Sequence, residues 1–305
     1  ILKGMEQTAG RLVIYIDPRY DVPRLLTVKG GKGCRLDTLE TYTEENSASP
    51  EVLARVVKEV QKRYPASSYG LVLWSHGLGW VPPEYSFPGG YAMRLPDPDM
   101  PRTKYYAEDE HPGTTGKAYM DIREMAARLP GHFNFILWDV CFMGGIEVAY
   151  ELRNKTDYMI ASPAEVISDG FPYEKIVPLF WGGEEAMKQI CREYYNHYNK
   201  YPVNSLWRSA VVGLVKTEEL EPLAAKVRTL LAGKTDYARA WHYPLNQGGL
   251  PMVFFDFGDY IRKMTTEEEY NSFKKLLDRV VIYKAATEKL FGEEVPADKF
   301  SGLTS

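Results

Sequence analysis

Short apolar runs alternate with segments of helical spacing along most of this chain, and that alternation limits the folds open to it. The strand-sized runs are residues 11–17, 69–74, 133–138, 158–161 and 209–215. Strands that alternate with helices at short intervals build βαβ units with right-handed crossovers. The sequence therefore predicts an α/β fold around a mainly parallel central sheet.

Helix signals fill the intervals between these runs. Ser49 is placed to cap a helix that has Pro50 in its first turn and apolar residues at helical spacing after it. The other helices are expected at residues 121–129, 146–153, 184–198 and 217–231, with the tail of a helix at 1–7. The polar stretch 18–48 is interpreted as a surface excursion with a hairpin tip at residues 30–33.

The chain has a less regular second part. A short strand is expected at residues 252–257, and a long amphipathic segment at 265–291 is read as helix. The parallel sheet is expected to end with the run at 209–215. We therefore predict a catalytic domain over residues 1–216 and a mostly helical C-terminal subdomain over 217–305.

Composition excludes several classes of protein. The formal net charge of -4 provides no basic field for a nucleic acid backbone, and the apolar runs are far shorter than the roughly 18 residues of a membrane helix. The cysteines at positions 34, 141 and 191 form no CxxC pair. Neither a zinc site nor a disulfide framework is therefore expected, and a cysteine is open to reaction.

Cys141 follows a predicted strand and precedes a predicted helix. The free amides and the positive dipole end of a helix favour the thiolate, which is the attacking form of cysteine. The alternative is that Cys141 fills a gap in the core, as most cysteines do. Asp139 and Met143 stand where an α/β-hydrolase elbow requires glycines, so that fold is disfavoured.

His76 also follows a predicted strand, and Gly77 comes directly after it. A neutral imidazole there can accept the thiol proton, and the glycine allows its amide to approach a developing oxyanion. The alternative is a structural histidine, and we interpret the histidines at positions 111, 132, 197 and 242 as structural or surface residues. Ligands of open parallel sheets bind beyond the carboxyl ends of the strands, where His76, Cys141 and Ser162 are expected to meet.

Together these motifs resemble the clostripain-type cysteine peptidases, which belong with caspases, gingipains and legumains. The resemblance rests on residues 74–77 (WSHG) and 139–144 (DVCFMG), and continues through 147–152, 157–162 and 169–173 in the family's order. Ser75, Val140 and Phe142 depart from the usual pattern, but none of them is a reacting group. The resemblance implies a caspase-like three-layer sandwich whose first strand is absent from this chain.

The resemblance also implies a mechanism. Cys141 and His76 would form a catalytic dyad, with the amides of Gly77 and Cys141 facing the oxyanion. The family cleaves after Arg or Lys, and matching positions place Asp139 and Asp169 near the pocket for that side chain. Alternatively Asp139 orders its loop and Asp169 caps a turn; Glu165 is a weaker candidate for the pocket.

Further expectations follow from the resemblance alone. Cleavage in the loop at residues 78–117 would activate the enzyme, and the basic candidates there are Arg94, Arg102, Lys104 and Lys117. The protein would be exported, although the chain shows no signal peptide, and calcium is a possible cofactor without an identified site. The competing functions are a catalytically silent binding or surface-interaction protein on the same fold, and a peptidase that cuts after another residue type.

Overall fold

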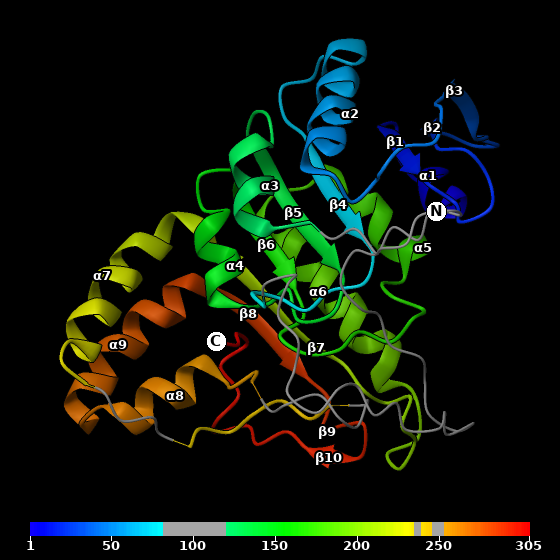
Figure 1. Cartoon of the computed structure of the whole chain (residues 1–305). Coiled ribbons are helices and arrows are strands. Elements are labelled where there is room, and N and C mark those ends of the chain that lie inside the picture. Colours follow the sequence, from blue (N-terminus) through cyan, green and yellow to red (C-terminus); the bar gives the residue numbers. More distant parts are fainter. Residues whose placement is uncertain (82–119, 235–238, 246–252) are drawn as a thin grey trace.

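The computed structural model describes residues 1–81, 120–234, 239–245 and 253–305, and helices cover both faces of its central sheet (Figure 1). The sheet has the order β4 (Gly70–Trp74), β5 (Phe133–Asp139), β6 (Thr156–Ala161), β7 (Val211–Lys216), β8 (Val281–Ala286). A smaller sheet consists of β1 (Arg11–Ile16), β2 (Arg24–Lys29) and β3 (Asp37–Thr41), and β9 (Lys289–Leu290) pairs with β10 (Glu293–Glu294). The helices are α1 (Leu2–Met5), α2 (Pro50–Arg63), α3 (Ile122–Arg128), α4 (Ile146–Glu151), α5 (Tyr173–Ile176), η1 (Val177–Trp181), α6 (Glu184–Asn199), η2 (Thr217–Glu219), α7 (Leu220–Leu231), α8 (Phe257–Met264) and α9 (Glu267–Val280).

The side chains of β5 point alternately to two core clusters. Ile136 and Trp138 belong to a cluster that includes residues of α3, α4, α7 and α9. Phe135 and Leu137 belong to a second cluster that includes one face of α6. Successive residues of a strand point to opposite faces, so the sheet is the middle of three layers. The expected α/β three-layer sandwich is confirmed.

The central sheet is mixed in direction. β4, β5 and β6 are parallel, whereas β7 pairs antiparallel with both β6 and β8. Of the strands described in this sheet, β7 is therefore the one that runs against the others. The prediction that the sheet ends at residues 209–215 is wrong, because β8 extends it.

Local signals account for the helix starts. The hydroxyl of Ser49 accepts from the amides of Glu51 and Val52 at 3.2 and 3.4 Å, as its position before Pro50 predicted. The carboxylate of Asp121 does the same for the first turn of α3. Such caps satisfy amides that have no partner inside the helix.

Three sequence-based predictions need correction. Residues 18–48 contain β2 and β3, although residues 30–33 do lie in the turn between them. The continuously apolar run at residues 69–74 is typical of a strand buried on both faces, but β4 is half-buried, because within the described residues it is the edge strand of its sheet. The predicted helix at 265–291 ends at Val280, and the β-branched and aromatic residues that follow it favour the strand β8.

Residues 303–305 connect α8 with the loop that follows β5. The amide of Phe257 donates to the Leu303 carbonyl at 3.0 Å, and the amide of Thr304 donates to the Gly144 carbonyl at 2.9 Å. The expected strand at 252–257 is reduced to bridges at residues 255 and 256, and residue 252 lies outside the described residues. The division at residue 216 remains a prediction, and the range 217–305 contributes β8 to the central sheet.

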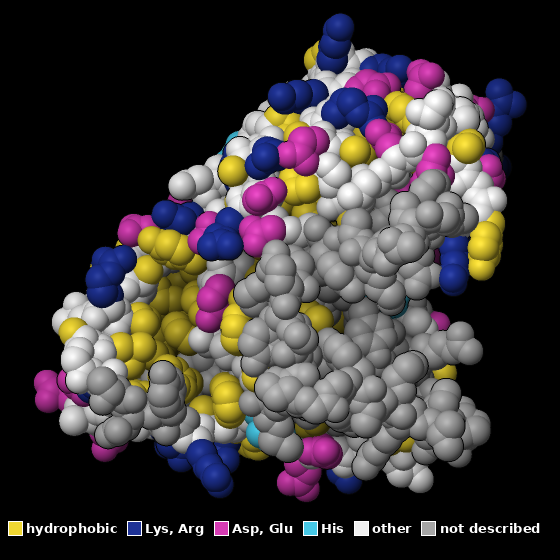
Figure 2. Space-filling model, in the orientation of Figure 1, with side chains coloured by type: hydrophobic (Ala, Val, Ile, Leu, Met, Phe, Trp, Pro, Cys, Tyr) yellow, Lys and Arg dark blue, Asp and Glu magenta, His cyan; other side chains and the backbone are white. Residues whose placement is uncertain are grey.

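Figure 2 shows hydrophobic side chains gathered beside α7 and α9 on one face of the molecule. None of the helices in the described ranges has both the length and the apolar character to cross a membrane.

Asp256 is the buried anchor of the C-terminal segment, which makes its removal a direct test of this arrangement. Its carboxylate accepts from the Ser301 amide and the Tyr243 hydroxyl, both at 2.7 Å, and from the Asp259 amide at 3.0 Å. Asp256→Ala removes the shared acceptor of three buried donors, of which the Tyr243 hydroxyl keeps only a longer contact of 3.4 Å with the Leu303 carbonyl. We therefore expect the free energy of unfolding in urea to fall by about 3 to 5 kcal/mol. Asp278→Ala, at an exposed position on α9, should change it little; equal losses would contradict the anchor role.

Candidate active site

The parallel pairing of β4 with β5 brings the two principal candidates together. Trp74 is paired with Asp139 at the carboxyl ends of these strands, so His76 and Cys141 each lie two residues beyond a paired position. β6 continues the parallel register on the other side of β5, which places Ser162 at the same edge. The predicted convergence of these three residues at one end of the sheet is confirmed.

Glycines allow the two loops to touch. A Cβ atom on Gly77 would lie 2.3 Å from Val140 Cγ1 and 2.6 Å from the carbonyl oxygen of Cys141. A Cβ atom on Gly79, whose φ is +58°, would lie 2.5 Å from the carbonyl oxygen of Phe142. The chain after His76 therefore packs directly on the backbone around Cys141, which a larger residue would prevent.

Cys141 is fully buried and bonded to the segment after β6. The amide of Val166 donates to Sγ at 3.1 Å, and the thiol lies 3.7 Å from the Val166 carbonyl. Helix α4 begins at Ile146, five residues later, so Cys141 does not directly precede the helix as predicted. Gly145 is the N-cap residue and a turn intervenes. An amide that donates to sulfur stabilises a thiolate over a thiol, and Val166 takes the role that we assigned to the helix.

The residue after Cys141 has an unusual backbone conformation. Phe142 has φ +60°, a left-handed value that a non-glycine residue rarely adopts. Its ring stacks on Phe254 with centroids 4.1 Å apart and planes at 12°, and Trp80 meets Phe254 edge-on at 6.4 Å. The amide of Phe142 also donates to the Ala164 carbonyl at 2.9 Å. Sequence reasoning missed Phe254, whose only signal was its place in a short apolar run.

Asp139 is buried and faces the turn at Gly170. Its Oδ2 atom accepts from the Tyr173 hydroxyl at 2.9 Å and from the Phe171 amide at 3.3 Å. A Cβ atom on Gly170 would lie 2.3 Å from the same oxygen, and φ at Gly170 is +66°. Burial, followed by the charge of Asp139, raises the pKa of Tyr173 well above its ordinary value. These contacts tie Asp139 to the turn at Gly170, and its role in a substrate pocket remains a prediction.

Asp169 differs from Asp139 because its side chain is exposed to solvent. Asp169 directly precedes Gly170 in the chain. Its charge also acts on His197, near the end of α6: burial lowers the pKa of His197, and the negative charge of Asp169 opposes that shift. Two acidic side chains thus flank one turn, and one is buried while the other is accessible. Glu165 is buried next to Val166, the residue whose amide donates to Cys141.

The remaining candidates lie elsewhere. His132 is exposed and pairs with Asp157 at 2.8 Å, and Cys191 is buried in α6, where burial raises the pKa of its thiol. His111 and the basic positions at 94, 102, 104 and 117 lie outside the described residues. Over the ranges that the structure describes, no group of three or more His, Cys, Asp or Glu side chains is arranged to hold a metal ion.

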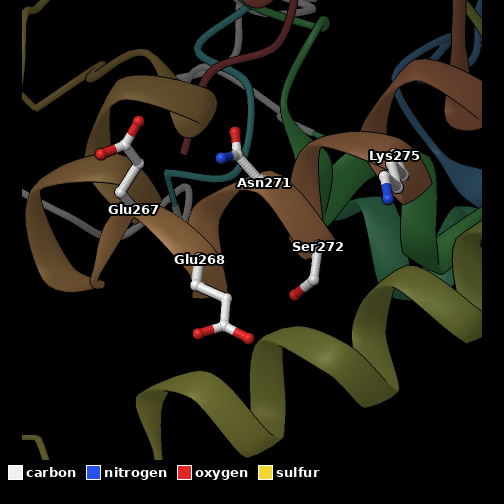
Figure 3. A pocket seen from close by; sticks show the side chains of 5 residues that line it. All are labelled: Glu267, Glu268, Asn271, Ser272 and Lys275. Atoms are coloured by element: carbon white, nitrogen blue, oxygen red, sulfur yellow. The ribbon is translucent and has the colours of Figure 1, made fainter.

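A surface hollow on α9 has no part in this arrangement. It is lined by Glu267, Glu268, Asn271, Ser272 and Lys275, which project from a single helix (Figure 3). Its two glutamates stand in the first turn of α9, where acidic residues favour the helix dipole. None of the predicted site residues lines it.

Known proteins resemble this chain in sequence and in structure. The chain is 27% identical over 169 residues to clostripain of Hathewaya histolytica, a match that spans 50% of this chain and 30% of that protein's length. An inactive zymogen C11 protease from Parabacteroides distasonis has a similar structure, with a TM-score of 0.79, 34% identity, and coverage of 99% of this chain and 84% of that chain. A secreted C11 cysteine protease from Bacteroides thetaiotaomicron, in complex with an irreversible peptide inhibitor, also gives a TM-score of 0.79, with 28% identity and the same coverage.

The sequence itself matches a family model over nearly its whole length. The model describes the Clostripain family and covers residues 1–293, which include both strands that lead to the candidate site. The resemblance seen in the WSHG and DVCFMG motifs is thereby confirmed. The chain belongs to the clostripain family.

Proposed function

We propose that this protein is a cysteine endopeptidase in which Cys141 is the nucleophile and His76 transfers protons. The observation that carries the proposal is the close packing of the two loops, with Gly77 against the Cys141 carbonyl, at the carboxyl ends of neighbouring parallel strands. Nucleophile and base must lie within reach of one another, and this packing brings their backbones together. Membership of the clostripain family and the inhibitor complex of the Bacteroides thetaiotaomicron protease support the same assignment.

The mechanism follows from the properties of thiol and imidazole. His76 accepts the thiol proton of Cys141 as Sγ attacks the substrate carbonyl carbon, and the amides of Gly77 and Cys141 donate to the resulting oxyanion. His76 gives its proton to the leaving amine, and the C–N bond breaks to leave a thioester. His76 then takes a proton from water as the water attacks the thioester carbonyl carbon. The C–S bond breaks to release the carboxylic acid, and His76 returns its proton to Sγ of Cys141, which restores the thiol.

We further propose that the substrate residue before the cleaved bond is Arg or Lys. Asp139 and Asp169 on the two sides of Gly170 provide negative charge beside the strand that leads to Cys141. The buried Asp139 orders the Gly170 turn, and the exposed Asp169 is accessible to a cation. A guanidinium can make two parallel hydrogen bonds to such a carboxylate.

Two related proposals concern where the protein acts and how it becomes active. Export is proposed because the Bacteroides thetaiotaomicron relative is secreted. Activation by cleavage is proposed because the Parabacteroides distasonis relative is an inactive zymogen. The calcium dependence inferred from the resemblance has no further support and stays a prediction.

Replacing either member of the dyad should abolish peptide cleavage. Cys141→Ala and His76→Ala are each expected to lower kcat/KM on a fluorogenic peptide ending in arginine by at least about 1,000-fold. Cys34→Ala removes a partly exposed cysteine near α1 and serves as the matched control, with unchanged activity expected. A catalytically silent binding protein would instead show no cleavage by correctly processed wild type and no alkylation of Cys141 at about pH 6.

The accessible acid should determine specificity. Asp169→Ala is expected to lower kcat/KM by about 100-fold for peptides ending in Arg or Lys, and to leave slow cleavage after glutamine or norleucine unchanged. Asp157→Ala, another exposed aspartate, is the control and should affect none of these substrates. Equal loss for all the peptides after Asp169→Ala would contradict the pocket assignment, and wild-type preference for a neutral residue would favour the alternative specificity.

Self-cleavage in the loop at residues 78–117 should accompany activation. We expect purified wild type to convert into two fragments while its activity rises, and Cys141→Ala to remain intact under the same conditions. Replacing Arg94, Arg102, Lys104 and Lys117 together by alanine should keep the chain whole and inactive. Wild type that stays intact on a gel and is fully active on a small peptide would show that cleavage is not required.

A further inference from the structure

Trp74 is a large apolar side chain left exposed beside the candidate active site. It is the last residue of β4, two residues before His76, and 66% of it is accessible, compared with 46% for Trp181 and 38% for Trp80. Tryptophan is rarely left in water to this extent, since burying its ring stabilises a protein or a complex. The accessible part of this indole, two residues before His76, is available for contact with a bound substrate.

The sheet register fixes the face on which Trp74 lies. Trp74 is paired with Asp139, as Val72 is with Leu137, two residues earlier along both strands. Val72 and Leu137 pack in the same core cluster, which also contains Phe171. Trp74 and Asp139 share that face, because side chains two residues apart in a strand point the same way. The indole therefore starts about 5 Å from the Asp139 side chain, the usual spacing of neighbouring strands.

An aromatic ring beside carboxylates suits one kind of substrate group. A guanidinium is planar and weakly hydrated, so it stacks on an indole while its edge forms hydrogen bonds to a carboxylate. The methylene stem of arginine or lysine also packs well on such a ring. The compact, strongly hydrated ammonium of lysine gains less from stacking than the guanidinium does.

We propose that Trp74 is a specificity-determining residue whose indole forms one wall of the pocket for the basic side chain before the cleaved bond. It stacks on the guanidinium of arginine, while Asp139 and Asp169 supply the negative charge. Trp74 in this way sets the preference for arginine over lysine. The inference rests on the proposed cleavage after basic residues.

The test compares Trp74→Ala and Trp74→Phe with wild type on matched peptides ending in Arg or Lys. Trp74→Ala should raise KM for the arginine peptide about 5- to 30-fold and change kcat little, with a smaller effect on the lysine peptide. Trp74→Phe keeps an aromatic face and should recover part of the loss. Inhibition by benzamidine, a small planar cation, should weaken in parallel. Trp181→Ala, which removes another exposed indole, should leave all these values unchanged.

A second readout separates a pocket wall from a structural role. The rate at which iodoacetamide alkylates Cys141 should be the same in wild type and Trp74→Ala, because the reagent is small and uncharged. A fall in that rate, an equal fall in kcat for both peptides, or an unchanged KM for arginine would overturn the assignment of Trp74. If wild type shows no preference for basic residues, the proposed specificity itself fails, and that result is visible before any Trp74 variant is made.

Discussion

The candidate site depends on the parallel register of β4 and β5. Pairing Trp74 with Asp139 sets the two following loops side by side at the same sheet edge. A shift of one residue in that register would turn the side chains of one strand to the opposite face. His76 and Cys141 are 65 positions apart in the sequence, and the backbone pairing of two apolar strands brings them to the same sheet edge. Gly77 then allows the two loops to touch.

The Cys141 loop is supported by segments distant in the sequence. The carbonyls of Ser162 and Ala164 accept from the amides of Gly144 and Phe142, and the amide of Thr304 donates to the Gly144 carbonyl. A left-handed non-glycine residue costs roughly 1 to 3 kcal/mol, so Phe142 needs such support to keep its conformation. Its stack on the buried Phe254 contributes about 0.5 to 1.5 kcal/mol beyond the area buried. The C-terminal range is therefore part of the support of the nucleophile and more than an appendage.

Patterns in the sequence predicted those structural features that depend on residues close together in the chain. The cap at Ser49 and the apolar runs of β4, β5 and β6 were recognisable because they depend on neighbouring residues. β7 was recognised as a strand, but its reversed direction was not, because a strand buried on both faces is apolar whichever way it runs. β8 was hidden because Val281 continues the apolar spacing of α9 without a glycine or proline between them. The amide of Val166 contacts Cys141, and the ring of Phe254 contacts Phe142. Both contacts depend on tertiary packing, which the spacing of residues in the sequence does not predict.

Burial separates two aspartates that the sequence presents as equivalent. Asp139 has donors from Phe171 and Tyr173 around its carboxylate, so moving it toward a substrate would leave those donors without an acceptor. Asp169 sits in solvent, where a salt bridge gains little until a substrate excludes water from it. The proposed pocket would therefore combine a buried charge that holds the Gly170 turn with an exposed charge whose interaction strengthens on binding. In the proposed pocket the indole of Trp74 would exclude water that screens the exposed carboxylate of Asp169, whereas the carboxylate of Asp139 is already buried.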